Sequence, residues 1–167
     1  MGWSSLEEFI RALEIRGELL RVGHPVDVRF EAGCIADRLV KRGGPAVVFD
    51  QPRLEDGSIS RFPLAMNLFG TRDRTNLALG VDEPSEIGEM MVGLMKPDIG
   101  GILRRPWTGI KLLRQGISMA PKRVSRGKCQ QVRIDDPDVT KLPIPVTWPD
   151  DGGPFMTLPL VVTADPK

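Results

Sequence analysis

The sequence predicts a small α/β layer domain followed by a second unit that begins as a series of extended segments and turns. Up to about residue 95, helical periods alternate with short apolar runs that are bounded by Gly and Pro. From Lys96 to Arg126 this periodicity stops, and after Lys128 short apolar segments alternate with Pro- and Asp-rich turns. We therefore place the α/β domain at residues 1–115, a connector at 116–127 and the start of the second unit at 128–167. Two or three strands bury little surface, so this second unit is expected to be incomplete.

Two helices are expected in the first 45 residues. Ser4 and Ser5 precede Glu7 and Glu8 at the spacing of a capping box, which predicts a helix that ends at Gly17. Its expected apolar face consists of Leu6, Phe9, Ile10 and Leu13. Asp27 is the expected cap of a second helix, which the Gly43-Gly44-Pro45 triplet ends. The residues expected to face inward from it are Ile35, Ala36, Leu39 and Val40.

Short apolar runs predict strands over residues 19–22, 46–49 and 64–67. The polar stretch 51–61 contains an Asp56-Gly57 turn signal and is expected to form a hairpin-like excursion. Two further helices are expected, one over residues 72–79 capped by Thr71, and one from Pro84 to about Met95. Ile87, Met90, Met91 and Leu94 form an apolar stripe on the last helix, and this pattern favours core packing over a cofactor site.

The second unit is expected to begin with a strand over residues 129–134 and a turn over 135–141. Prolines at positions 143, 145, 149 and 154 fix φ and remove backbone donors, which predicts a stiff extended path over 142–146. A tight acidic turn follows at 149–154, and then a strand over 158–163. Such a stiff loop is typical of functional sites.

Composition excludes several classes of function. A net charge of +1 argues against nucleic acid or an anionic membrane as partner. No apolar run approaches the roughly 18 residues of a transmembrane segment, and the acidic N-terminus does not fit a secretory signal. The two cysteines, Cys34 and Cys129, lack metal-ligand spacing and favour a reduced cytoplasmic protein with buried, inert thiols.

Few residues are candidates for chemistry. His24 is the only histidine, which excludes a histidine-based triad or a multi-histidine metal site, and its Gly-His-Pro setting favours a solvated side chain. Asp150 and Asp151 suggest either a turn or a pair of metal or acid-base carboxylates, and we favour the turn. A basic cluster is either a solvated linker face or a contact for an anion, a phosphate or another subunit; it comprises Arg104, Arg105, Lys111, Arg114, Lys122, Arg123, Arg126 and Lys128.

Several segments together resemble the UbiD-type decarboxylases. The run LPIPVTWPDDGGPFMTLPLVVTADPK at 142–167 is similar to a signature stretch of that family. Shorter similarities occur in the same order along the chain, in SLEEFIRALEIRGELLRV, IADRLVKRGGPAVVF, NLFGTRDRTNLALG and KCQQVRIDDPDVTKLP.

The resemblance implies an N-terminal α/β domain, a flavin-binding domain of split-β-barrel type and a C-terminal oligomerisation domain. This chain would hold the first domain and only the first strands of the second. The implied activity is decarboxylation of an aromatic or α,β-unsaturated acid, of which polyprenyl-hydroxybenzoate in ubiquinone biosynthesis is one example. The implied cofactors are prenylated FMN, manganese (Mn2+) and potassium (K+), and the full-length family members are expected to be homo-oligomers.

The resemblance implies a cofactor-binding role for a single residue of this sequence. Thr157 matches a family threonine near the flavin, although a strand threonine that serves only β-propensity fits the position equally well. The family's Asn-x-x-x-x-Arg segment and both catalytic acids are expected after Lys167, so no catalytic residue is assigned and the chain alone is expected to be inactive. Two alternatives stay open: a non-catalytic module that docks on a separate catalytic chain, and a free-standing flavin-binding domain.

Overall fold

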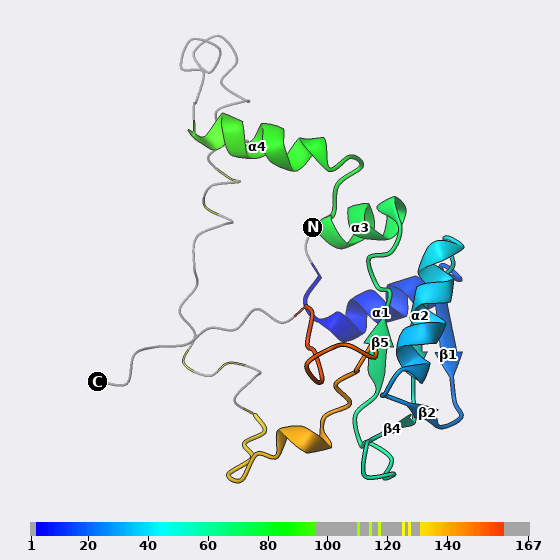
Figure 1. Cartoon of the computed structure of the whole chain (residues 1–167). Helices are drawn as coiled ribbons and strands as arrows, with labels where there is room; N and C mark the ends of the chain where they lie inside the picture. Colours follow the sequence, from blue (N-terminus) through cyan, green and yellow to red (C-terminus); the bar gives the residue numbers. More distant parts are fainter. Residues whose placement is uncertain are drawn as a thin grey trace. The chain divides into compact units, whose positions relative to one another are not determined.

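The computed structural model describes residues 3–95 and 131–158, with residues 110, 114, 117, 125 and 127 between them (Figure 1). The chain forms two compact units, which are described separately. The first comprises residues 1–78 and 137–167, and the second comprises residues 79–136. The first unit therefore combines the N-terminal elements with residues far along the chain. The division into domains at residues 115–127 stays a prediction.

The centre of the first unit is a three-stranded sheet in the order β1-β3-β5. β1 (Leu19–Val22) pairs in parallel with β3 (Ala46–Phe49), and β3 pairs antiparallel with β5 (Leu64–Met66). All three strands were expected from their apolar runs. β3 lies in the middle and is buried at every position. Its sequence is therefore a continuous apolar run, in which apolar and polar residues do not alternate.

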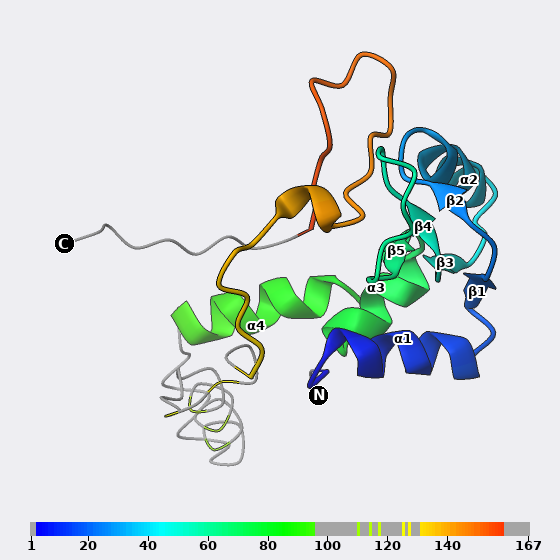
Figure 2. The same cartoon turned by 90° about the horizontal axis from the view of Figure 1, so that it is seen from below.

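The two long helices of the unit cover opposite faces of this sheet (Figure 2). Side chains alternate between the faces along β3 because successive residues of a strand point to opposite sides. Ala46 packs with Phe9 and Leu13 of α1 (Leu6–Ile15), and Val47 and Phe49 pack with Ala32 of α2 (Glu31–Lys41). These two small clusters are the cores of the unit.

α1 begins as expected. Ser5 is its N-cap and accepts a hydrogen bond from the Glu8 amide at 3.2 Å, while the Glu8 carboxylate accepts from the amide and the hydroxyl of Ser4. Phe9 and Leu13 are buried, but Leu6 is 56% exposed, so its assignment to the apolar face is wrong. Leu6 shares the helical spacing of Phe9 and Leu13, but more than half of its side chain is left uncovered by the rest of the unit.

The expected start of α2 is also wrong. Phe30, with φ of 68°, is the N-cap in place of Asp27. Asp27 instead belongs to the strand β2 (Val26–Asp27), and its amide donates to the carboxylate of Glu31. Ala36 is buried, and Ile35 and Leu39 are partly buried. Val40, in the last turn of the helix, is 48% exposed, so its assignment to the inward face is wrong.

A second, two-stranded sheet was not expected. β2 pairs in parallel with β4 (Pro52–Arg53), which lies within the predicted hairpin-like excursion. The turn of that excursion is confirmed, with Gly57 at φ of 82° and an antiparallel bridge between Arg53 and Ile59. Two-residue strands carry no periodicity, so the sequence pattern could not reveal them.

The next two helices are confirmed. α3 (Arg72–Leu79) is capped by Thr71, whose hydroxyl accepts from the Arg74 amide at 3.3 Å. α4 (Ser85–Met95) belongs to the second unit. On α4, Ile87 and Met90 are partly buried, whereas Met91 is 54% exposed, so the expected core role is wrong for Met91.

Residues 131–134 form no strand, so the expected strand over 129–134 is wrong in its described part. The expected turn over 135–141 is present and includes the 3-10 helix η2 (Val139–Lys141). The extended path and the acidic turn that follow it are confirmed, whereas residues 159–163 of the last expected strand lie outside the described residues. Among the described residues, no helix is long and apolar enough to cross a membrane.

Candidate ligand pocket

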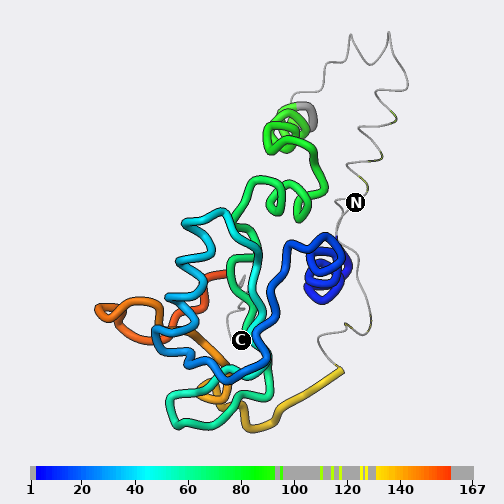
Figure 3. Tube along the Cα trace, turned by 90° about the vertical axis from the view of Figure 1, so that its right-hand side faces the viewer, coloured from blue at the N-terminus to red at the C-terminus, as the bar shows by residue number. Residues whose placement is uncertain are grey.

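Residues 137–158, here called the strap, return to the N-terminal elements and run beside them (Figure 3). Val146 is 3% exposed and is the anchor of the strap. Its amide donates to the Val28 carbonyl at 3.1 Å, and its carbonyl accepts from the Phe30 amide at 2.8 Å. This bridge places the strap directly before the first turn of α2.

The next residue of the strap touches α2 itself. A Cβ atom built on Gly33 would lie 3.1 Å from Cγ2 and 3.2 Å from Cα of Thr147. Gly33 is in the first turn of the helix, where a glycine lowers helix stability relative to alanine. The absence of a side chain therefore allows the strap backbone to approach the helix closely.

A second group of contacts holds the strap at η2. Lys141 forms an ion pair with Asp56 at 2.8 Å, and the Lys141 carbonyl accepts from the Ser60 hydroxyl at 3.5 Å. The hydrogen bond from Lys141, together with those from Ser58, lowers the pKa of Asp56 well below its usual value. The pKa of Lys141 is correspondingly raised by Asp56.

The strap and β5 line an open pocket of about 390 Å³. One wall is the β5 segment, and the other walls are two stretches of the strap that are joined by a hydrogen bond from the Phe155 amide to the Pro145 carbonyl at 3.0 Å. The lining is mostly apolar: Leu64, Ala65, Met66, Asn67, Leu142, Pro143, Ile144, Pro145, Phe155, Met156, Thr157 and Leu158. Its volume and apolar character are typical of a pocket for a small organic ligand.

Thr157, the one predicted cofactor ligand, is exposed and lines this pocket. Its role toward a flavin stays a prediction. Asp151 has a structural role instead, because its Oδ2 accepts from the amides of Thr147 and Trp148 at 3.2 and 2.9 Å. The acidic pair is thus part of a turn, as the sequence favoured.

The other sequence candidates do not join the pocket. His24 is exposed, as expected for a solvated turn residue. Cys34 is a free and exposed thiol, so the expectation of a buried cysteine is wrong: it lies on the outer side of α2, next to the buried Gly33. Arg114 is exposed, whereas Cys129 and the other members of the basic cluster lie outside the described residues.

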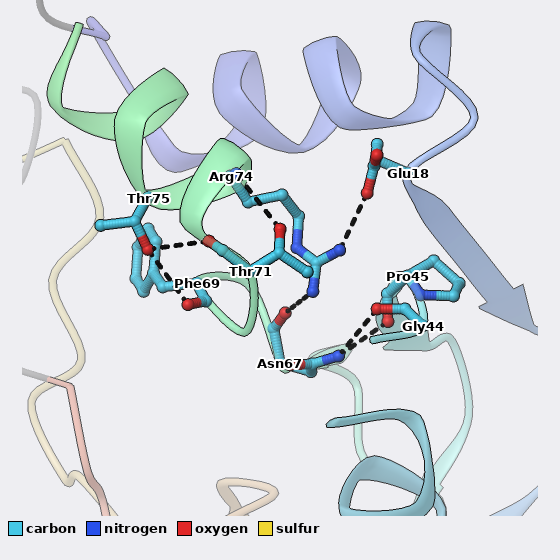
Figure 4. A network of polar contacts seen from close by, with 8 residues as sticks. All are labelled: Glu18, Gly44, Pro45, Asn67, Phe69, Thr71, Arg74 and Thr75. Carbon is cyan, nitrogen blue, oxygen red and sulfur yellow. Dashed lines mark hydrogen bonds and ion pairs between the residues drawn. The ribbon is translucent and has the colours of Figure 1, made fainter. Parts of the chain in front are cut away.

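A buried arginine that the sequence did not single out supports the pocket wall (Figure 4). Arg74 is 2% exposed; it donates to the Glu18 carboxylate at 2.8 Å and to the Asn67 carbonyl at 3.3 Å. Asn67 follows β5 with φ of 57°, and its side-chain amide donates to the Pro45 carbonyl at 2.9 Å. The network fixes the end of the strand that lines the pocket. In the sequence, the one sign of this network is the pattern NLFG, in which a glycine follows an apolar strand.

The described residues supply no cluster of three or more His, Cys, Asp or Glu side chains that could hold a metal ion. They therefore do not fit the manganese centre that the family resemblance implies. The described residues that line the pocket are apolar apart from Asn67 and Thr157.

Comparison with family models identifies the class of protein. Residues 10–91 match the model of the 3-octaprenyl-4-hydroxybenzoate carboxy-lyase N-terminal domain, and residues 122–167 match that of the Rift-related domain of the same enzymes. Two models of one carboxy-lyase class therefore match in order along most of the described chain. The chain belongs to the UbiD family.

Two similar solved structures are those of the vanillic acid decarboxylase of Sedimentibacter hydroxybenzoicus in its open form, one of them with a truncated ShVdcD. With the truncated form the identity is 22% over 58% of this chain and 21% of the other, at a TM-score of 0.46. With the second structure the identity is 23% over 57% and 20% of the two chains, at a TM-score of 0.44. This chain thus spans about a fifth of the length of these decarboxylase chains.

Proposed function

We propose that the chain is the N-terminal part of a carboxy-lyase that decarboxylates an aromatic or α,β-unsaturated carboxylic acid, non-oxidatively and reversibly. The observation that carries this proposal is the ordered match to the N-terminal and Rift-related domain models of one carboxy-lyase class. A polyprenyl-hydroxybenzoate is one acid of this kind. The proposed setting is a cytoplasmic homo-oligomer.

Prenylated FMN is the proposed cofactor, with Mn2+ and K+ bound by residues outside those described. The pocket fits the ring portion of such a flavin because its walls are apolar and Thr157 adds a hydroxyl at the rim. When bound, the modified flavin would supply an electron sink for the electron pair that CO2 leaves on the substrate carbon. The phosphate and the metal ions require ligands that the pocket does not contain.

The chain's own residues then have a positioning role. The β5 wall and the proline-rich stretch of the strap exclude water from one face of a bound ring. The Thr157 hydroxyl donates to, or accepts from, a polar edge atom of that ring. The Arg74 network holds the end of β5 in place from behind. No proton transfer is assigned to a described residue.

The first test is made on the purified chain alone. Mixed with reduced prenylated flavin, Mn2+ and a panel of hydroxybenzoic and cinnamic-type acids, it is expected to release no CO2 and to bind no stoichiometric flavin by absorbance. Stoichiometric binding would overturn the proposal that the flavin ligands are largely elsewhere.

The second test adds the catalytic residues that the proposal places outside this chain. The chain is co-expressed with the polypeptide encoded directly after Lys167, or in a neighbouring frame or gene, and CO2 release from the same acids is measured. Activity of the assembly supports a carboxy-lyase. Stable co-purification without activity would instead support the alternative, a non-catalytic module that docks on a separate chain.

A further inference from the structure

The strap is bound to the N-terminal elements at a point distinct from the pocket. The anchor Val146 and its neighbour Thr147 contact the segment before α2 and the first turn of α2. Pro145, which precedes the anchor directly, already lines the pocket. The pocket wall and the anchored bridge are therefore consecutive residues of one stiff, proline-rich path, in which a displacement of one moves the other.

Three observations indicate that this contact is built for close approach. Val146 is almost fully buried although the residues that follow it are exposed or only partly buried. Phe30 adopts φ of 68°, which is costly for a non-glycine residue, and its amide is the donor to the Val146 carbonyl. Gly33 occupies a helical position where alanine would stabilise the helix but would contact Thr147 at 3.1 to 3.2 Å.

We propose that Gly33 and Val146 are positioning residues for the pocket: the first turn of α2 is a docking site for the strap, and docking there sets the wall that faces β5. Both residues lie outside the pocket lining. The proposal deepens the proposed function, on which it rests only for the identity of the ligand. The coupling between docking and the pocket wall can be measured without any ligand.

The test uses hydrogen exchange and methionine-methyl NMR on the whole chain. The amides of Phe30 and Val146 report docking, since they make the two bridge hydrogen bonds, and amides of β3 report the stability of the unit. The methyl groups of Met66 and Met156 report the pocket, since one lies on β5 and the other on the strap.

Gly33→Val is expected to raise exchange at Phe30 and Val146 at least tenfold and to shift both methionine signals, while β3 amides keep their exchange rates. Gly33→Ala is the milder variant: it should stabilise α2 and still raise exchange at the two bridge amides. Thr147→Ser, which removes the contacting methyl group, should restore part of the protection in the Gly33→Ala background.

Gly88→Ala is the matched control, because Gly88 is also in a helix but has nothing within 4 Å of a built Cβ atom. It should leave the bridge amides and both methionine signals unchanged. The proposal is overturned if Gly33→Val leaves bridge exchange unchanged, if the bridge opens without any shift at Met66 and Met156, or if β3 exchanges as fast as the bridge. None of these readouts involves flavin, metal or substrate. Stoichiometric flavin binding by the chain alone, or an inactive assembly, would therefore count against the proposed function without affecting the docking proposal.

Discussion

At the scale of single residues, the pair of Arg74 and Glu18 is asymmetric. The guanidinium is 2% exposed, whereas the Glu18 side chain is 43% exposed. Among the described residues, removing the carboxylate leaves the buried cation with the Asn67 carbonyl as its one acceptor. Removing the cation instead leaves a carboxylate that water can reach.

Glu18→Ala is therefore expected to lower the free energy of unfolding by about 3 kcal/mol. Arg74→Met, which keeps the volume of the side chain, should cost less, within about 2 kcal/mol. Chemical denaturation measures both. Glu14→Ala removes the acid of an exposed pair with Arg21 and should cost at most about 1 kcal/mol. Equal losses for Glu18→Ala and Arg74→Met would contradict the asymmetry.

Gly70 is a second position where adding one carbon atom is expected to lower stability. A Cβ atom there would lie 1.7 Å from Oδ1 of Asn67, so Gly70→Ala expels the Asn67 side chain from its hydrogen bond with Pro45. The expected loss of stability is about 1–3 kcal/mol. Adding Asn67→Gly, which suits the positive φ, should recover part of it, whereas Gly23→Ala has nothing within 4 Å and serves as control. Additive losses in the double variant would argue against the clash.

At the scale of elements, one contact of the strap depends on pH. It is the ion pair between Lys141 of η2 and Asp56 in the turn after β4, here called the tie. Asp56 faces Lys141 and Ser58, and its negative charge opposes the ionisation of the nearby Asp138. The pKa of Asp56 is lowered on folding. The stability that the tie gives the folded unit is therefore fully present above the ordinary pKa of 3.8, and it is lost progressively as the pH falls below that value. The pKa of Lys141 is raised on folding, so the stability that its charge contributes is present below the ordinary pKa of 10.5 and is lost as the pH rises above that value.

Exchange at Val146 is thus expected to be constant across neutral pH, after correction for intrinsic rates, and to increase as the solution is acidified below about pH 4. Asp56→Asn should remove most of this dependence, and Glu55→Gln, at the adjacent exposed ion pair with Arg29, should not. A wild-type acid dependence that survives Asp56→Asn would exclude this tie as its cause.

Elements with a clear period were predictable, and those shaped by tertiary contacts were not. The helices α1, α3 and α4 and the strands β1, β3 and β5 follow from capping residues and apolar runs. The start of α2 was missed because Phe30 takes a left-handed conformation that its residue type disfavours. Leu6, Val40 and Met91 share the spacing of their buried neighbours, but only the extent of the facing surface determines which residues it covers.

At the scale of the whole molecule, the sequence predicted the family and the importance of the proline-rich run, but not its location. Where the strap meets α2, the contact consists of one buried residue, Val146, and a close approach that the missing side chain of Gly33 allows. Neither leaves a periodic signal. The Arg74 network was missed for a related reason, since a lone arginine in a polar helix is indistinguishable from a solvated one until its partners far along the chain are known.

The central claim is that this chain contributes one wall of a decarboxylase site that other residues complete. CO2 release from a hydroxybenzoic or cinnamic-type acid by the co-expressed assembly tests it most directly, with Thr157→Val as the variant. We expect no release by the chain alone and measurable release by the assembly. In the assembly that carries Thr157→Val, one neutral hydrogen bond is lost. The rate of CO2 release should fall about 3- to 10-fold, while the two chains still co-elute. An assembly that is folded, loaded with flavin and metal, and equally active with Thr157→Val would contradict the role of this wall.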